Sequence, residues 1–183
     1  DDNANKMLGG TIGYELPGTL SGLAVGVHAF GSTVNIYSSA GSALKQTRLR
    51  MAGGFFGYDS DDWEAIGEFY RFANTETASG IKRSSNAGFV HVGRAFGTLT
   101  PYLRYERASL DPDDSFFASQ RVGRSYRRAV VGARQMLDAR SSVKFEISDT
   151  SEDSAMLLDG LGSLEPFPAS RYRRAAFQYS IAF

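Results

Sequence analysis

Cysteine is absent from the 183 residues, which excludes disulfide frameworks, thiolate nucleophiles and zinc–cysteine centres. Histidine occurs only as His28 and His91, too few for a histidine-rich metal centre, so we expect neither a metal nor a cofactor. No apolar run approaches the roughly 18 residues of a membrane-spanning helix. Lys and Arg total 20, as do Asp and Glu, so no net basic field predicts a nucleic-acid partner.

Glycine and aromatic residues are plentiful, with 20 Gly, 13 Phe and 9 Tyr against only 5 Pro, which is typical of strand-and-turn proteins. Alternation of apolar and polar residues predicts an all-β chain of about nine strands, the clearest at 142–148. The predicted strands cover approximately residues 7–16, 21–36, 47–58, 62–73, 86–97, 98–108, 123–137, 141–150 and 171–183. One helical turn is expected within 155–161.

The connections between these strands alternate in length. Short ones at 16–20, 59–62, 97–98 and 138–140 separate long polar ones at 37–46, 74–85, 109–122 and 151–170. A soluble sandwich with Greek-key crossovers has no reason to keep this order, whereas an outer-membrane barrel has short turns at one rim and long loops at the other. The alternation therefore predicts an up-and-down antiparallel barrel with long external loops.

The last predicted strand places aromatic or aliphatic residues at alternate positions, namely Phe177, Tyr179, Ile181 and Phe183. This segment, together with the meander, resembles the C-terminal portion of a Gram-negative outer-membrane β-barrel of the porin type. In that family the final strand ends in an aromatic residue, and the barrel-assembly machinery reads this end. The resemblance implies that these four residues form an assembly signal and that the chain lies in the cell outer membrane.

If Phe183 lies at the periplasmic rim, the last strand runs from the external rim to the periplasmic rim. With nine alternating strands the first strand runs the same way, so the strand number is odd. A complete single-chain bacterial barrel has an even number. We therefore expect residues 1–183 to be the C-terminal part of one transmembrane β-barrel domain, whose remaining strands come from the same or another chain. Barrels of about sixteen to eighteen strands enclose an aqueous channel.

If the apolar face of each predicted strand points outward, alternation predicts a set of charged and polar residues facing the lumen. These are Glu15, Arg48, Arg50, Glu64, Glu68, Arg104, Glu106, Arg128, Arg134, Lys144, Glu146, Arg174 and Gln178. Arg104, Arg128, Arg134, Lys144 and Arg174 could form a ladder that favours anions. The alternative is a set of cross-strand salt bridges, such as Arg104 with Glu146 or Lys144 with Glu106, which stiffen the wall without selecting ions.

Lys and Arg residues lie at the external start of each predicted strand that runs toward the periplasmic rim. The cations are Lys6, Arg48, Arg50, Lys82, Arg83, Arg124, Arg127, Arg128, Arg171, Arg173 and Arg174. Guanidinium groups there would pair with lipopolysaccharide phosphates, the alternative being solvated strand ends. At the opposite rim, an aromatic girdle is predicted from Tyr14, Tyr58, Trp63, Phe96 and Tyr102, the alternative being ordinary strand-end packing.

Three smaller features admit a functional and a structural interpretation. His28 and His91 are expected to be hydrogen-bonded wall residues instead of ligands or bases. The carboxylates at 111–114 could collect a divalent cation but lack calcium-loop spacing, which favours a solvated turn. Loop 151–170 is too apolar to stay solvated, so we expect it to fold inward and constrict a pore or to pack on a neighbouring subunit.

These features predict a porin that passes small hydrophilic solutes or ions through a water-filled channel, with a mild anion preference. No nucleophile elbow or serine–histidine pattern occurs, so we do not expect an enzyme. The expected partners are outer-membrane lipid and lipopolysaccharide, the remaining barrel strands, the barrel-assembly machinery and further copies in a homo-oligomer. The alternatives are a structural barrel that encloses or anchors a partner protein and a soluble β-sandwich binding module.

Overall fold

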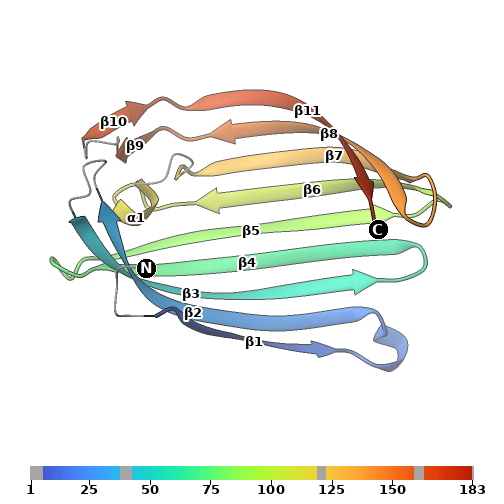
Figure 1. The fold of residues 1–183 in the computed structure, drawn as a ribbon, viewed down its shortest axis with the longest axis horizontal. Helices are drawn as coiled ribbons and strands as arrows, with labels where there is room; N and C mark the ends of the chain where they lie inside the picture. The colour runs from blue at the N-terminus through green and yellow to red at the C-terminus, as the bar shows by residue number, and fades with distance from the viewer. Residues whose placement is uncertain (1–5, 38–42, 119–122, 159–162, 183) are drawn as a thin grey trace.

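The computed structural model describes residues 6–37, 43–118, 123–158 and 163–182. Its main element is a nine-stranded antiparallel sheet (Figure 1). The strands lie side by side in the order of the sequence, and two short strands outside this sheet come between its eighth and ninth strands. The strands are β1 (Leu8–Glu15), β2 (Leu23–Tyr37), β3 (Ala43–Asp59), β4 (Trp63–Glu76), β5 (Lys82–Arg94), β6 (Leu99–Ser109), β7 (Tyr126–Met136), β8 (Ser141–Glu152) and β11 (Ser170–Ile181). The predicted all-β class, the nine strands and their up-and-down order are confirmed.

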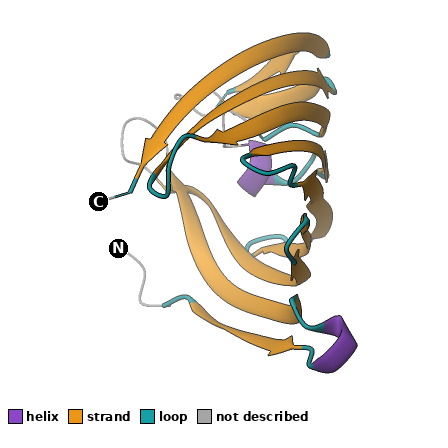
Figure 2. Cartoon of the chain, turned by 90° about the vertical axis from the view of Figure 1, so that its right-hand side faces the viewer, coloured by secondary structure: helices purple, strands orange, loops and turns teal. Residues whose placement is uncertain are grey.

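The sheet is curved into a trough with one concave and one convex face, and it does not close on itself (Figure 2). Its edge strands, β1 and β11, run in the same direction (Figure 1). Neither edge has a further partner strand among the described residues. Each edge therefore presents unpaired backbone donors and acceptors.

Among the described residues, strands extend into the predicted long connections 37–46 and 74–85, so these two connections are shorter than predicted. β3 begins at Ala43 and β4 continues to Glu76. Polar side chains pair across the ladders in this region, with Gln46 donating to Asn35 Oδ1 at 3.0 Å and Lys45 Nζ 3.1 Å from Glu76 Oε1. Because these pairs stabilise neighbouring strands, the ladders run on through sequence that looks like loop.

The helical turn predicted within 155–161 is also wrong. Residues Ala155–Leu158 form β9, which pairs with β10 (Leu164–Phe167) in a small second sheet. The helical turn lies instead at α1 (Ser115–Ala118), where Asp114 Oδ1 accepts a hydrogen bond from the backbone N–H of Phe116 at 3.0 Å. A carboxylate at this position satisfies a backbone donor that a short helix leaves free, which is why the turn begins there.

The two faces of the sheet differ in chemical character. Residues opposed in an antiparallel pair share a face, so register assigns each side chain. The convex face carries exposed apolar side chains such as Leu103, Val131 and Phe177, the last 72% exposed. The concave face carries most of the charged residues of β4–β8 and holds the few buried apolar side chains of the sheet, among them Leu49, Tyr102 and Val130.

Register corrects the predicted face of Arg48 and Arg50. Thr47 pairs with Glu76 and Arg48 with Thr75, so Thr47 and Leu49 face the concave side while both arginines face the convex side. Alternation failed here because Leu49 and Met51 alternate with the two arginines, so polarity alone turns the arginines toward the lumen. In the structure α1 contacts β3, and Leu49 is buried on the concave face at this end.

Candidate functional site

The concave side chains of β4–β8 form a continuous charged surface, which we name the inner wall. From the predicted set it contains Glu64, Glu68, Arg104, Glu106, Arg128, Arg134, Lys144 and Glu146. Arg174 and Gln178 of β11 share this face through their pairing with Ser148 and Lys144, and Glu15 lies on it in β1. The sequence prediction of a shared face therefore holds for this set, but not for Arg48 and Arg50.

Glu64 joins three strands at one end of the inner wall. Its Oε2 lies 2.6 Å from Arg134 Nη2, and its Oε1 lies 3.2 Å from His91 Nε2. The side chain lies over Gly93, its partner on β5, where an added Cβ would come within 2.9 Å of Glu64 Cγ. His91 is thus a wall residue with a carboxylate partner, as predicted, and it also lies against the Tyr102 ring.

Glu146 on β8 collects hydrogen bonds and charge from β6 and from its own strand. The Tyr102 hydroxyl donates to Glu146 Oε1 at 2.7 Å, and Lys144 Nζ lies 3.1 Å from the same oxygen. Arg104 Nη1 approaches it at 3.7 Å. The Tyr102 ring lies over Gly132, where any Cβ would fall 2.4 Å from the ring, so this glycine makes the geometry possible.

Glu106 is the third acidic centre of the inner wall. Arg104 Nε lies 2.8 Å from its Oε1, and Arg128 Nη1 lies 3.3 Å from its Oε2. Arg128 Nε also donates to Thr150 Oγ1 at 3.0 Å. Arg104 therefore bridges Glu106 and Glu146, so the cations and carboxylates form one chain of contacts across β6, β7 and β8.

These contacts agree in part with the salt-bridge interpretation of the ladder. The predicted pair of Arg104 with Glu146 is present, whereas Lys144 lies beside Glu146 and not beside Glu106. Register explains the difference, because Lys144 and Glu146 are two residues apart on the same face of β8. Arg174 has no ion-pair partner in the part of the chain that the structure describes, and it lines a hollow of about 230 Å³ with Arg128 and Glu146.

Tyr102 departs from the predicted aromatic girdle. It faces the concave side and is only 5% exposed, because its hydroxyl reaches Glu146. Tyr14, Trp63 and Phe96 are exposed, as a girdle requires. Arg94 lies over the Trp63 and Phe96 rings, 5.2 and 5.1 Å from their centroids, which adds a cation–π contact at this rim.

In the connection between β6 and β7, which we name loop 110–125, the described residues 110–118 turn inward, and α1 lies on the concave side of the trough (Figure 2). Asn74 donates to Asp114 Oδ2 at 2.7 Å, and the Asp111 backbone N–H donates to Ser85 Oγ at 2.9 Å. Phe117 packs edge-on against Phe72, with ring centroids 5.4 Å apart. A polar anchor and an aromatic anchor therefore hold this loop against β4 and β5.

Asp114 is 2% exposed, and this burial raises the pKa of its carboxyl above the ordinary value. The hydrogen bonds from Asn74 and from the Phe116 backbone oppose the rise, as does Arg83, while Asp111 adds to it. Packing of the loop removes water from this carboxyl and therefore disfavours its charged form.

Loop 151–170, the segment predicted to fold against something, contains the β9–β10 hairpin, and β9 contacts α1. Arg124 ties the two loops together, because it pairs with Glu152 and donates to the Pro168 carbonyl at 3.4 Å. Its guanidinium also lies 5.9 Å from the centroid of the Phe167 ring. Residues 159–162 of this loop lie outside the described residues.

The acidic stretch 111–114 is occupied by contacts within the protein. Asp111 and Asp113 both lie near Arg83 Nη1, at 3.9 and 3.4 Å, and Asp114 bonds Asn74. Among the described residues, no group of three or more His, Asp or Glu is placed to hold a metal ion. His28, on the concave face of β2, stacks on Phe55 and lies against Tyr70.

Three residues of the predicted assembly signal, Phe177, Tyr179 and Ile181, lie on the convex face of β11 and are all more than half exposed. Phe183 lies outside the described residues. Sequence reasoning missed the role of loop 110–125, although the adjacent Phe116 and Phe117 in an otherwise polar segment are a signal that could have found it.

No family model matches this chain, and no curated protein matches its sequence. None of the described helices is long and apolar enough to span a membrane.

Proposed function

We propose that this chain forms part of the wall of a water-filled β-barrel channel in the cell outer membrane, through which small hydrophilic solutes or ions diffuse passively. One observation carries the proposal: the same curved sheet is apolar and exposed on its convex face and charged on its concave face. In water, a convex face with Phe177 72% and Leu103 62% exposed would be costly. Lipid outside and water inside suit both faces at once.

Closure of the barrel requires additional strands. Unpaired amides and carbonyls at the edges of β1 and β11 would cost several kcal/mol each in lipid. Because the two edges run in the same direction, antiparallel closure needs an odd number of further strands. A total of about sixteen to eighteen strands would leave an aqueous lumen, with those strands supplied by the same or another chain.

The charges of the inner wall suit weak selectivity. Three carboxylates, Glu64, Glu106 and Glu146, are each neutralised by nearby cations. Arg174 adds a positive charge that no carboxylate in the described chain neutralises. Glu68 adds a negative charge that no described cation neutralises, so the charges of the wall balance and the proposed preference for anions is mild. The α1 helix with its loop would narrow the lumen near the rim where that loop lies.

The surroundings of the barrel complete the proposal. Convex arginines near the rim of the long loops would contact lipopolysaccharide phosphates. The barrel-assembly machinery would read the end of β11, including Phe177, Tyr179, Ile181 and Phe183. A homo-oligomer would cover part of the convex face.

Single-channel recording in planar bilayers tests the proposal. We expect the full-length protein to give stable conductance with a reversal potential shifted slightly toward anions. Lys144→Glu, on the inner wall, should shift the reversal potential toward cations. Arg173→Glu reverses the same charge on the convex face of β11 and should leave it unchanged.

Absence of conductance by correctly inserted protein would refute the channel. A stoichiometric protein that co-purifies with the inserted barrel and blocks it would instead favour the structural barrel that encloses a partner. Full solubility of the folded protein without detergent would favour a soluble binding module.

A further inference from the structure

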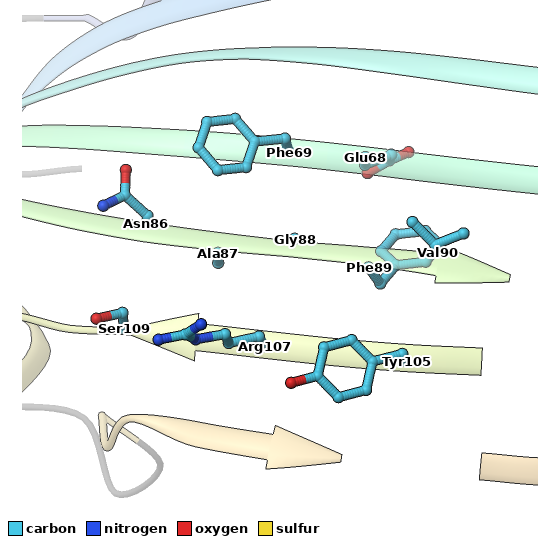
Figure 3. Close-up of a pocket in the computed structure, with 10 residues that line it drawn as sticks. All are labelled: Glu68, Phe69, Asn86, Ala87, Gly88, Phe89, Val90, Tyr105, Arg107 and Ser109. Carbon is cyan, nitrogen blue, oxygen red and sulfur yellow. The ribbon is translucent and has the colours of Figure 1, made fainter. Parts of the chain in front are cut away.

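A hollow of about 570 Å³ lies on the convex face, across β4, β5 and β6, on the side opposite the inner wall (Figure 3). Register aligns three residues of these strands in one row, Phe69 with Gly88 and Gly88 with Arg107. Gly88 has no side chain, so the middle of this row is empty. The hollow is therefore a gap in the outer surface with glycine as its floor.

The floor cannot be filled by a simple substitution. A Cβ at Gly88 would lie 2.7 Å from the Glu68 carbonyl oxygen, because the β4 and β5 backbones approach closely there. Contacts below 3 Å with backbone cannot be relieved by rotating a side chain. The close approach of the two strands thus keeps the hollow open.

The hollow has an apolar end and a polar end. Val90 and Tyr105 line one end and are 46% and 49% exposed, and Phe69, 55% exposed, lies across the middle row from Arg107. Asn86, Arg107 and Ser109 line the other, and Figure 3 shows the Arg107 guanidinium extending along β6 toward Ser109. Ser109 is the last residue of β6, at the rim of the trough where α1 lies, so the polar end of the hollow points toward that rim.

The charge at the polar end is uncompensated. Arg107 is exposed and has no ion-pair or hydrogen-bond partner within the described part of the chain. Arg71 and Arg127 share its face through their pairing with Asn86 and Arg107. No described Asp or Glu of β4–β7 faces this side, whereas arginines on the inner wall such as Arg104, Arg128 and Arg134 each contact a carboxylate.

We propose that this hollow binds one phosphate-bearing lipid of the leaflet at the long-loop rim. Its phosphate lies on Arg107, with Asn86 and Ser109 as further donors, and an acyl chain lies along Val90 and Tyr105. Guanidinium pairs with phosphate through two parallel hydrogen bonds, and the apolar end removes acyl surface from water. This site rests on the proposed function, since only a membrane-embedded sheet turns its convex face to lipid.

Native mass spectrometry of the full-length protein tests the site, with bis-phosphorylated lipid A as the probe. We expect one lipid A to be retained, and dephosphorylated lipid A to be retained about tenfold less. Arg107→Ala should lower retention of lipid A about tenfold, and Arg107→Gln, which keeps the length of the side chain, should do the same. Arg127→Ala removes a neighbouring charge of the basic rim outside the hollow and should lower retention less than Arg107→Ala. Arg94→Ala is the matched control, because it removes the same charge from the convex face at the opposite rim, and it should retain the lipid.

Equal losses in the Arg107 and Arg127 variants would overturn the site in favour of a diffuse basic belt. Equal retention of the dephosphorylated lipid, or inorganic phosphate that competes as strongly as lipid A, would overturn the lipid assignment. Bilayer conductance of the wild type, recorded in parallel, separates the two proposals. A conducting protein that retains no lipid A refutes this site alone, while a protein that does not insert into membranes refutes both.

Discussion

Tyr102 and Gly132 show how a single glycine organises the inner wall. The ring occupies the space that a side chain at position 132 would need, and the hydroxyl thereby reaches Glu146 at 2.7 Å. Glu146 in turn lies beside Lys144 and Arg104. The position of three charges therefore depends on one missing methyl group.

Gly132→Ala is expected to destabilise the folded protein by about 1–3 kcal/mol, because the new Cβ would overlap the Tyr102 ring. Gly57→Ala is the matched control, since Gly57 also lies within a strand and on the concave face. Nothing lies within 4 Å of the position that an added Cβ would take there. Urea unfolding in detergent measures both. Equal stabilities of the two variants would show that Tyr102 is not held by this contact.

Asp114 is the residue at which pH should act on loop 110–125. Its folded-state pKa is raised above the ordinary 3.8 by burial, so the protonated carboxyl favours the packed loop. This contribution is fully present below pH 3.8 and is lost as the pH rises through the raised pKa. The packing of the loop should therefore weaken with rising pH in this window.

Asp114→Asn should remove that pH dependence, because an amide keeps the hydrogen-bonding shape without the charge. Limited proteolysis of the loop over the acidic range measures the effect. Asp113→Asn is the control, since Asp113 is 72% exposed at its side chain and lies near Arg83 alone. A pH profile that Asp114→Asn leaves unchanged would assign the titration to another group.

At the scale of elements, α1 is the part of the structure that enters the trough. The Phe72–Phe117 contact and the Asn74–Asp114 hydrogen bond are its two anchors on β4. Arg124 extends the arrangement to the β9–β10 hairpin through Pro168 and Phe167. The described parts of the β6–β7 connection and the β9–β10 hairpin therefore contact one another at this rim.

Phe117→Ala should release α1 and raise single-channel conductance, because truncating a buried phenylalanine costs about 3–5 kcal/mol and removes the aromatic anchor. Phe96→Ala removes the same ring at the opposite rim, where it is 57% exposed, and should leave conductance unchanged. A conductance that Phe117→Ala does not alter would place α1 outside the path of ions.

At the scale of the whole molecule, the opposite faces of the sheet make a prediction that needs no channel recording. Ile147 is exposed on the convex face of β8, and the adjacent Ser148 faces the concave side toward Arg174. The chain has no cysteine, so a single engineered thiol can be labelled cleanly at either position.

In lipid vesicles, nitroxide-labelled Ile147→Cys should be relaxed by oxygen dissolved in lipid, and Ser148→Cys by a water-soluble nickel complex. Electron paramagnetic resonance measures both accessibilities. Two labels that are equally accessible to the nickel complex would mean that water covers both faces, which contradicts the proposed membrane location.

The sequence by itself determined the nine strands and their order. Alternation of apolar and polar residues has a period of two, and each short turn joins neighbouring strands, so both signals are local. The same alternation placed most of the inner wall on one face, from Glu64 to Arg174. It failed for Arg48 and Arg50, because α1 contacts β3 at that end and the apolar Leu49 is buried on the concave face there.

Only the tertiary structure decided which charges meet and which loop turns inward. Contacts such as Arg134 with Glu64 join residues 70 positions apart, and they depend on register and side-chain reach. Tyr102 lies inward because Gly132, on another strand, leaves room for its ring. Residues 110–118 of loop 110–125 pack inward because buried Asn74 and Ser85 offer them partners. Phe116 and Phe117 signal locally that this segment is covered, but no local pattern identifies the distant strands that cover it.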